Sequence, residues 1–191
     1  MQNFKTEQKP WKTLIAGQSS LLVLQRRRLY QTRVLPRSRP PEALQKRSCV
    51  NWEPKLPTPI ANYVDAARLG NVVFLAGQGP RKPDGKFFTG KVGGDVTLDE
   101  AYQHARLVGM GLLAAMRHEL GSLDKVARVG RVFGMVNAAP DFMDHPKVIN
   151  GCSDLFVQVF GDRGRHARCA VGMGSLPFNL TVEIEAVIEV A

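Results

Sequence analysis

Two helices can be placed from the spacing of apolar residues along the chain. The first follows Thr97 and Glu100, which have the spacing of a capping box, and it is predicted to end at Gly121. The second is predicted between Pro146 in its first turn and Gly161 at its end. The inward positions of the two helices are Ala101, Ala105, Val108, Leu112, Met116, Val148, Cys152, Leu155, Phe156 and Val159.

Five strands are predicted around these helices. A short strand at 63–67 pairs with a buried strand at 72–76 through Gly70 and Asn71, and Gly77 ends the buried strand. The other strands are expected at 126–137, at about 167–173 and at 181–190. In the last strand, Val182, Ile184, Ala186 and Ile188 alternate with Glu183, Glu185 and Glu189. This order of elements predicts an α+β fold, with one sheet and both helices on one face.

Small residues inside the first helix also carry information about packing. Gly109 and Gly111 each cost about 1 kcal/mol relative to alanine within a helix. That cost is understandable if the helix lies close on the sheet. We therefore interpret both glycines as packing residues.

The strand near residue 170 has an unusual distribution of side-chain sizes. Its alternation places Arg168 on one face with Ala170, Gly172 and Gly174. The opposite face, expected to be the core face, carries Ala167, Cys169, Val171 and Met173. The small residues beside Arg168 predict open space, and Cys169 is interpreted as a buried hydrophobic residue.

Two interpretations of Arg168 stay open on the residues alone. Its guanidinium can bind a small carboxylate through two parallel charge-assisted hydrogen bonds. Alternatively, it pairs with Glu183 or Glu185 on a neighbouring strand. Glu183 has two interpretations as well, because it either lies on a solvated surface or holds a water molecule as general base or proton shuttle.

Composition assigns the positive charge to the beginning of the chain. The net charge is +9, but residues 1–50 contain eleven Lys or Arg against two acids, whereas residues 51–191 contain fifteen of each. We therefore expect a folded domain at 51–191 behind a basic extension at 1–50, which is a transit-peptide-like segment, a disordered tail, an overextended start or a basic arm that binds nucleic acid. The neutral domain gives nucleic-acid binding no support, and no apolar run is long enough for a membrane span.

Cysteine and histidine spacing gives no sign of a metal site. Three cysteines without a CxxC pair favour a reducing compartment, and the four histidines are expected to be exposed or to cap helices. Cytoplasmic localisation is expected, or an organelle such as a mitochondrion or plastid if residues 1–50 are cleaved. The motif "GMGLLA" at 109–114 lies within the first helix, so it is no dinucleotide site.

Three segments together resemble a known family. They are "ANYVDAARLGNVVFLAGQGP", "RHARCAVGMGSLP" and "VEIEAVIEV". In this order they resemble the Rid family of reactive-intermediate deaminases, also called the YjgF family, in a RidA-like branch, over about residues 55–191. The resemblance implies a chorismate-mutase-like fold and a homotrimer whose sheets form a barrel, with a pocket at each subunit interface.

The resemblance also implies an activity and site residues. Such proteins hydrolyse enamines and imines such as 2-aminoacrylate to a 2-keto acid and ammonia, without a cofactor or a metal. Arg168 aligns with the arginine that holds the substrate carboxylate, and Glu183 with the acid that positions the attacking water. Tyr63, Gly77 and Asn150 fall where the family lines its pocket. A non-catalytic module that binds a small carboxylate is the alternative.

Two positions depart from typical deaminases of this family. Ala76 stands where a serine usually precedes the Gly-Gln pair, and Ala170, in the substrate-binding group, stands where a cysteine often follows the arginine. Both changes leave carboxylate binding by Arg168 intact, and they put the substrate and the deaminase activity itself in question.

Overall fold

The computed structural model describes residues 61–191 of the chain. The predicted extension at 1–50, and the first ten residues of the domain expected at 51–191, lie outside the described residues. The helices and strands are β1 (Ala66–Leu69), β2 (Val72–Gln78), α3 (Leu98–Leu120), β3 (Val126–Asn137), α4 (His145–Phe160), β4 (Ala167–Met173) and β5 (Val182–Val190), with short 3₁₀ turns η2 (Leu123–Lys125), η3 (Gly161–Gly164) and η4 (Pro177–Asn179).

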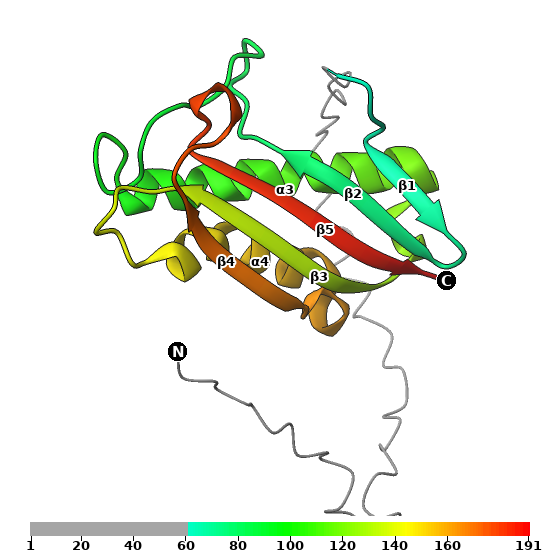
Figure 1. The fold of residues 1–191 in the computed structure, drawn as a ribbon. Coiled ribbons are helices and arrows are strands. Elements are labelled where there is room, and N and C mark those ends of the chain that lie inside the picture. The colour runs from blue at the N-terminus through cyan, green and yellow to red at the C-terminus, as the bar shows by residue number, and fades with distance from the viewer. Residues whose placement is uncertain (1–60) are drawn as a thin grey trace, which may run out of the picture. The chain divides into compact units, whose positions relative to one another are not determined.

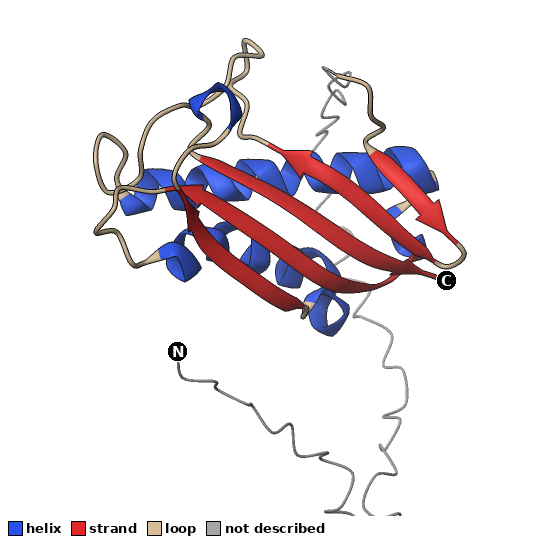
Figure 2. Cartoon of the chain, viewed as in Figure 1, coloured by secondary structure: helices blue, strands red, loops and turns tan. Residues whose placement is uncertain are grey.

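The strands form a single mixed sheet in the order β1-β2-β5-β3-β4. Only β3 and β4 run parallel, because α4 connects them, while the other neighbours are antiparallel. Both helices cover the same face of the sheet, as Figures 1 and 2 show. The predicted α+β fold, one sheet with two helices on one face, is confirmed.

The core lies between this face of the sheet and the two helices. Its fully buried side chains include Val73, Val108, Leu112, Met116, Val129, Val132, Ile149, Phe156, Ile184 and Ile188. The predicted inward positions of both helices are buried except Val159, which is 39% exposed. No helix in residues 61–191 is both long and apolar enough to cross a membrane.

Helix α3 begins and ends where the sequence predicts. The Thr97 hydroxyl accepts from the Glu100 amide at 3.3 Å, and the Glu100 carboxylate accepts from the Thr97 amide at 2.9 Å, which completes the capping box. Gly121 ends the helix in the left-handed conformation, with φ at 78°. Both helix ends are therefore fixed by local hydrogen bonds.

The two glycines of α3 leave room for side chains of two different elements. A Cβ atom on Gly109 would lie 3.1 Å from the Cys152 sulfur of α4, and one on Gly111 would collide with the Gln78 side chain of β2. The packing interpretation is confirmed for Gly111, which faces the sheet. Gly109 accommodates the second helix instead.

Two details differ from the predictions, one at strand β1 and one in helix α3. Strand β1 starts at Ala66, so Tyr63 lies before it, although the two-residue turn at Gly70 and Asn71 is as expected. His104, expected to be exposed or capping, is buried against Phe88 and hydrogen-bonded to Thr181 at 3.1 Å. A hydrogen-bond partner makes burial of a neutral imidazole tolerable.

The alternation of β4 is as predicted, but its two faces are exchanged. Arg168 and Ala170 point toward α4, and a Cβ atom on Gly172 would collide with the His145 ring. Cys169 is exposed on the opposite, helix-free face, together with Val171. The small residues of β4 therefore make room for α4, and the expectation of open space beside Arg168 was wrong.

Candidate functional site

The predicted site residues fall into two groups within the chain. Tyr63, Gly77 and Glu183 line one cavity of about 530 Å³ beside β2 and β5. Asn150 and Arg168 are joined by a hydrogen bond between α4 and β4, the strand at the opposite edge of the sheet from β1. The structure thus assembles two half-sites.

A β-bulge in β2 forms one wall of the cavity. Leu75 pairs with Ala186 and Gln78 with Ile184, so β2 contains one more residue than β5 over this stretch. A Cβ atom on Gly77 would collide with the Glu183 carboxylate. Glycine therefore lets the bulged backbone approach the carboxylate.

Glu183 differs from the other two glutamates of β5. The Glu185 carboxylate lies 3.9 Å from Arg131, and that of Glu189 accepts a hydrogen bond from the Asn71 amide at 3.1 Å. The Glu183 carboxylate makes no hydrogen bond or ion pair with any residue in 61–191. Burial, followed by the charge of Glu185, raises the pKa of Glu183 above its usual range. A half-buried carboxylate of this kind in a cavity is a candidate for proton transfer.

Arg168 is held from one side only. Its Nη1 donates to the Asn150 side-chain oxygen at 2.8 Å and to the Ser153 hydroxyl at 3.0 Å. The N–H groups on Nε and Nη2 have no partner within the described chain. The predicted alternative of an ion pair with Glu183 or Glu185 is wrong, and the guanidinium keeps donors for a planar anion.

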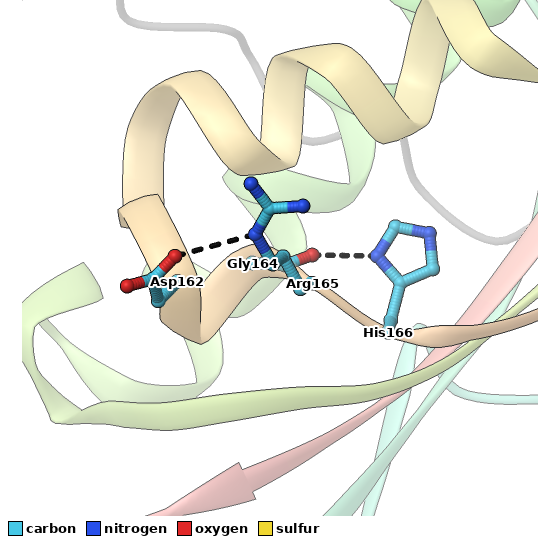
Figure 3. A network of polar contacts seen from close by, with 4 residues as sticks. All are labelled: Asp162, Gly164, Arg165 and His166. Carbon is cyan, nitrogen blue, oxygen red and sulfur yellow. Dashed lines mark hydrogen bonds and ion pairs between the residues drawn. The ribbon is translucent and has the colours of Figure 1, made fainter. Parts of the chain in front are cut away.

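His166 orients the hydroxyl that holds Arg168. Its Nδ1 lies 2.6 Å from the Gly164 carbonyl oxygen, and its Nε2 lies 3.1 Å from the Ser153 hydroxyl. Figure 3 shows the ring turned toward Gly164, next to the 3.2 Å contact between Arg165 and Asp162.

The Gly164 carbonyl oxygen, at one end of this network, determines which of its atoms donate and which accept. A carbonyl oxygen only accepts, so Nδ1 of His166 carries the proton, and Nε2 of the neutral ring accepts from Ser153. Burial lowers the pKa of His166, which favours the neutral ring. The oxygen of Ser153 is then left to accept from Arg168.

Ala170 and Cys152 have no visible part in the site chemistry of one chain. Ala170 packs against the core on the same face of β4 as Arg168. Burial raises the pKa of Cys152 to about 12, which makes this thiol unreactive. Among residues 61–191, no three His, Cys, Asp or Glu side chains are grouped to hold a metal ion.

The two half-sites of one chain lie on opposite faces of the sheet. Arg168 is in register with the core residue Val132 of β3 and contacts α4, so it lies on the helix face. Glu183 is in register with Met135 of β3, on the helix-free face. The two side chains therefore cannot act on one molecule within a single chain.

The helix-free face carries apolar side chains where a free surface would be polar. They are Phe74, Phe133, Met135, Cys169, Val171 and Val187, which are exposed or only partly buried. Charged residues such as Arg131, Glu183 and Glu185 lie between them. A face of this composition is typical of contact with another protein surface.

Ser153 and His166 were missed by the sequence reasoning, although a signal for them exists. His166 directly precedes β4, two residues before Arg168, and Ser153 lies three residues after Asn150 on α4. These spacings place each pair on one face of its element. The signal becomes readable only once it is known which face of β4 meets α4.

Fold and site together define a class of protein: a mixed sheet with two helices on one face, and half-sites at its two sides. A family model described as "YjgF/chorismate mutase-like, putative endoribonuclease" matches residues 49–189. The chain belongs to this family, which confirms the resemblance seen in the sequence.

Individual relatives agree with this assignment. Protein TCP17 of Trypanosoma cruzi is 39% identical over 137 residues, covering 71% of this chain and 86% of its own. A RutC family protein of Pyrococcus abyssi is 26% identical over 133 residues, covering 70% of this chain and 90% of its own. The crystal structure of Atu1372 from Agrobacterium tumefaciens, a protein described as of unknown function, is 44% identical with a TM-score of 0.67 and covers 70% of this chain and 85% of its own.

Proposed function

We propose that the protein is a cofactor-free hydrolytic deaminase that converts small reactive enamines and imines, of the 2-aminoacrylate and 2-iminopropanoate type, to 2-keto acids and ammonia. The proposal rests on the environment of the Glu183 carboxylate. It is the one glutamate of β5 without a partner in residues 61–191, and it lines a cavity beside Gly77. Members of the family are often enzymes, which supports a catalytic role for this carboxylate.

Arg168 binds the substrate in this proposal. The carboxylate of a 2-imino acid accepts two parallel hydrogen bonds from the donors on Nε and Nη2, while Asn150 and Ser153 hold Nη1.

Glu183 activates water and moves protons. An enamine protonated at its terminal carbon, or an imine protonated at its nitrogen, gives the same iminium ion. Water then adds to C2, and one of its protons passes through Glu183 to the nitrogen, which becomes an ammonium group. The C–N bond breaks, ammonia leaves with the bonding electron pair, and the remaining hydroxyl releases its proton to solvent as the C=O bond forms. An imine is already electrophilic, so position and proton transfer are sufficient.

The complete site is formed between two copies of the chain, in a homotrimer. Arg168 and Glu183 lie on opposite faces of one sheet, so the arginine of one copy has to meet the glutamate of the next. The apolar helix-free face supplies a contact surface for this assembly. A monomeric mass in solution would refute this part of the proposal.

A direct assay tests the activity. D-Alanine and an amino-acid oxidase generate 2-iminopropanoate, and the protein should increase the rate of pyruvate formation above that of buffer. Arg168→Ala and Glu183→Gln should each abolish the increase. The matched controls Arg165→Ala and Glu189→Gln, which remove exposed charges outside both half-sites, should keep it. No rate above buffer for the native protein refutes the enzyme, and carboxylate binding without turnover would favour the non-catalytic module.

Mixed oligomers test the shared site. Arg168→Ala and Glu183→Gln chains, each inactive alone, are refolded together. If each site takes its arginine from one copy and its glutamate from another, about a quarter of the interfaces in a random mixture regain both native residues. Failure to regain activity, with mixed oligomers shown by mass, would contradict a site shared between chains.

A further inference from the structure

A stacked pair of aromatic rings lies in the same cavity as Glu183. The rings of Phe87 and Phe178 are 5.8 Å apart at an interplanar angle of 20°, and the Arg81 guanidinium lies 4.2 Å from the centre of the Phe87 ring. All three residues line the cavity with Glu183. The proposed proton-transfer group therefore has an aromatic wall beside it.

Phe178 is an exposed side chain on a strained backbone. Its φ is +54°, in the left-handed region that bulky residues rarely adopt, and the residue is 63% exposed. Burial in the chain therefore does not explain why phenylalanine stands here. Strain of this kind occurs at ligand-binding positions when the surroundings enforce it.

The surroundings do enforce the turn that carries Phe178. The buried Asn137 donates to the Asn179 side-chain oxygen at 2.9 Å, and the Gly90 amide donates to the Asn179 carbonyl at 2.9 Å. The Leu180 amide donates to the Pro177 carbonyl at 3.0 Å. The ring is thus held in place over the cavity by bonds that do not involve its own side chain.

The cavity is also larger and more apolar than a three-carbon acid needs. Its volume of about 530 Å³ falls in the range of pockets that enclose much larger ligands, about 300–1,000 Å³. Three of the eight exposed large hydrophobic residues in the described part of the chain, Tyr63, Val64 and Phe178, lie at this cavity. Exposed apolar side chains are therefore concentrated where a ligand would bind.

We propose that the site prefers 2-imino acids with a large, planar apolar side chain, which stacks on Phe178 and Phe87 while the reacting carbon lies at Glu183. This inference rests on the proposed deaminase function and names its substrate class. Aromatic rings stacked in an offset arrangement supply both the affinity and the orientation of such a side chain. The reaction is the same hydrolysis of the C=N bond.

Two imines distinguish this inference from the function on which it rests. D-Phenylalanine and D-alanine, each with an amino-acid oxidase, generate the aromatic and the small imine at equal flux. We expect kcat/KM for the phenylalanine-derived imine to be higher by about tenfold or more. Hydrolysis of both imines at equal efficiency, or preference for the small one, overturns the inference and leaves the deaminase intact. If neither imine is hydrolysed, the proposed deaminase function itself is refuted.

A glycine variant separates a ligand contact from a structural role. Phe178→Gly removes the ring and also relieves the backbone strain, because glycine adopts positive φ freely. We expect the preference for the aromatic imine to disappear and the thermal midpoint to stay or rise. Leu69→Ala, which removes an exposed apolar side chain of β1, should change neither rate.

Two results with this variant would overturn the inference. One is an unchanged preference in Phe178→Gly. The other is loss of the oligomer with both rates falling together, which would assign the ring to contact between subunits.

Discussion

The hydrogen-bond network behind Arg168 allows a substitution test with a built-in rescue. His166→Asn keeps a side-chain N–H near the position of Nδ1, able to donate to Gly164, but it is too short to reach Ser153. His166→Gln places a carbonyl oxygen near the position of Nε2, able to accept from Ser153. If His166 acts by orienting the Ser153 hydroxyl, His166→Gln should keep the substrate binding that His166→Asn loses.

The size of the effect follows from the contacts on Nη1. A hydrogen bond to a charged group contributes about 1.5–3 kcal/mol. Asn150 continues to hold Nη1 at 2.8 Å when the Ser153 contact is weakened, so we expect the lower end of this range. A loss of about 1.4 kcal/mol is a tenfold change in an equilibrium constant. His166→Asn and Ser153→Ala should each raise KM for 2-iminopropanoate about tenfold, with kcat nearly unchanged.

The assay combines kinetics with binding and a double-mutant cycle. KM, kcat and the Kd for pyruvate are measured for the native protein, the three single variants and the double variant His166→Asn, Ser153→Ala. Because His166 is a positioning residue that acts through Ser153, its substitution should add less than about 0.5 kcal/mol in the Ser153→Ala background. Equal losses in both backgrounds, or a His166→Gln variant as impaired as His166→Asn, would refute the reasoning, as would a fall in kcat at constant KM.

Three further substitutions, one of them with a matched control, test the other contacts. Gly77→Ala should displace the Glu183 carboxylate and lower kcat about tenfold to a hundredfold, with a free energy of unfolding within about 1 kcal/mol of the native protein, as measured by urea denaturation. The raised pKa of Glu183 means that the folded state binds its proton more tightly than the unfolded state, so this group reduces stability as pH rises through its folded pKa. Glu183→Gln should therefore be more stable than the native protein at pH 8 and converge with it near pH 4, and a gap that widens toward acid pH would contradict this. Gly151→Ala should cost about 1–3 kcal/mol because the added Cβ collides with the Tyr102 carbonyl of α3, whereas Gly174→Ala, with no atom within 4 Å, should stay within about 0.5 kcal/mol; equal costs would show that the helix contact does not limit stability.

Elements with strong periodicity or local caps could be predicted from the sequence. Helix α3 has both, and its bounds follow from Thr97 and Gly121. Strand β5 alternates so regularly that its core face, including Ile184 and Ile188, was assigned correctly. In these segments the residues that determine the structure lie close together in the sequence, so no knowledge of distant contacts is needed.

The faces of β4 could not be assigned in the same way. Hydrophobicity favours the face of Val171 and Met173, but that face lies away from the helices. The core face is the one with small residues, because α4 approaches so closely that Gly172 has no room for a Cβ atom beside His145. The exchange places Arg168 and Glu183 on opposite faces of the sheet, so within one chain they form two half-sites.

The two departures from the usual deaminase sequence fall in different parts of the structure. Ala76 lines the cavity beside Gly77, whereas Ala170 packs against the core behind Arg168. Neither methyl group replaces an atom that the proposed chemistry requires, since that proposal assigns carboxylate binding to Arg168 and proton transfer to Glu183. A methyl at position 76 in place of a hydroxyl makes the cavity less polar, in the same direction as the aromatic wall at its other side. The departures therefore bear on which imine enters the cavity, and they leave the groups that would act on it unchanged.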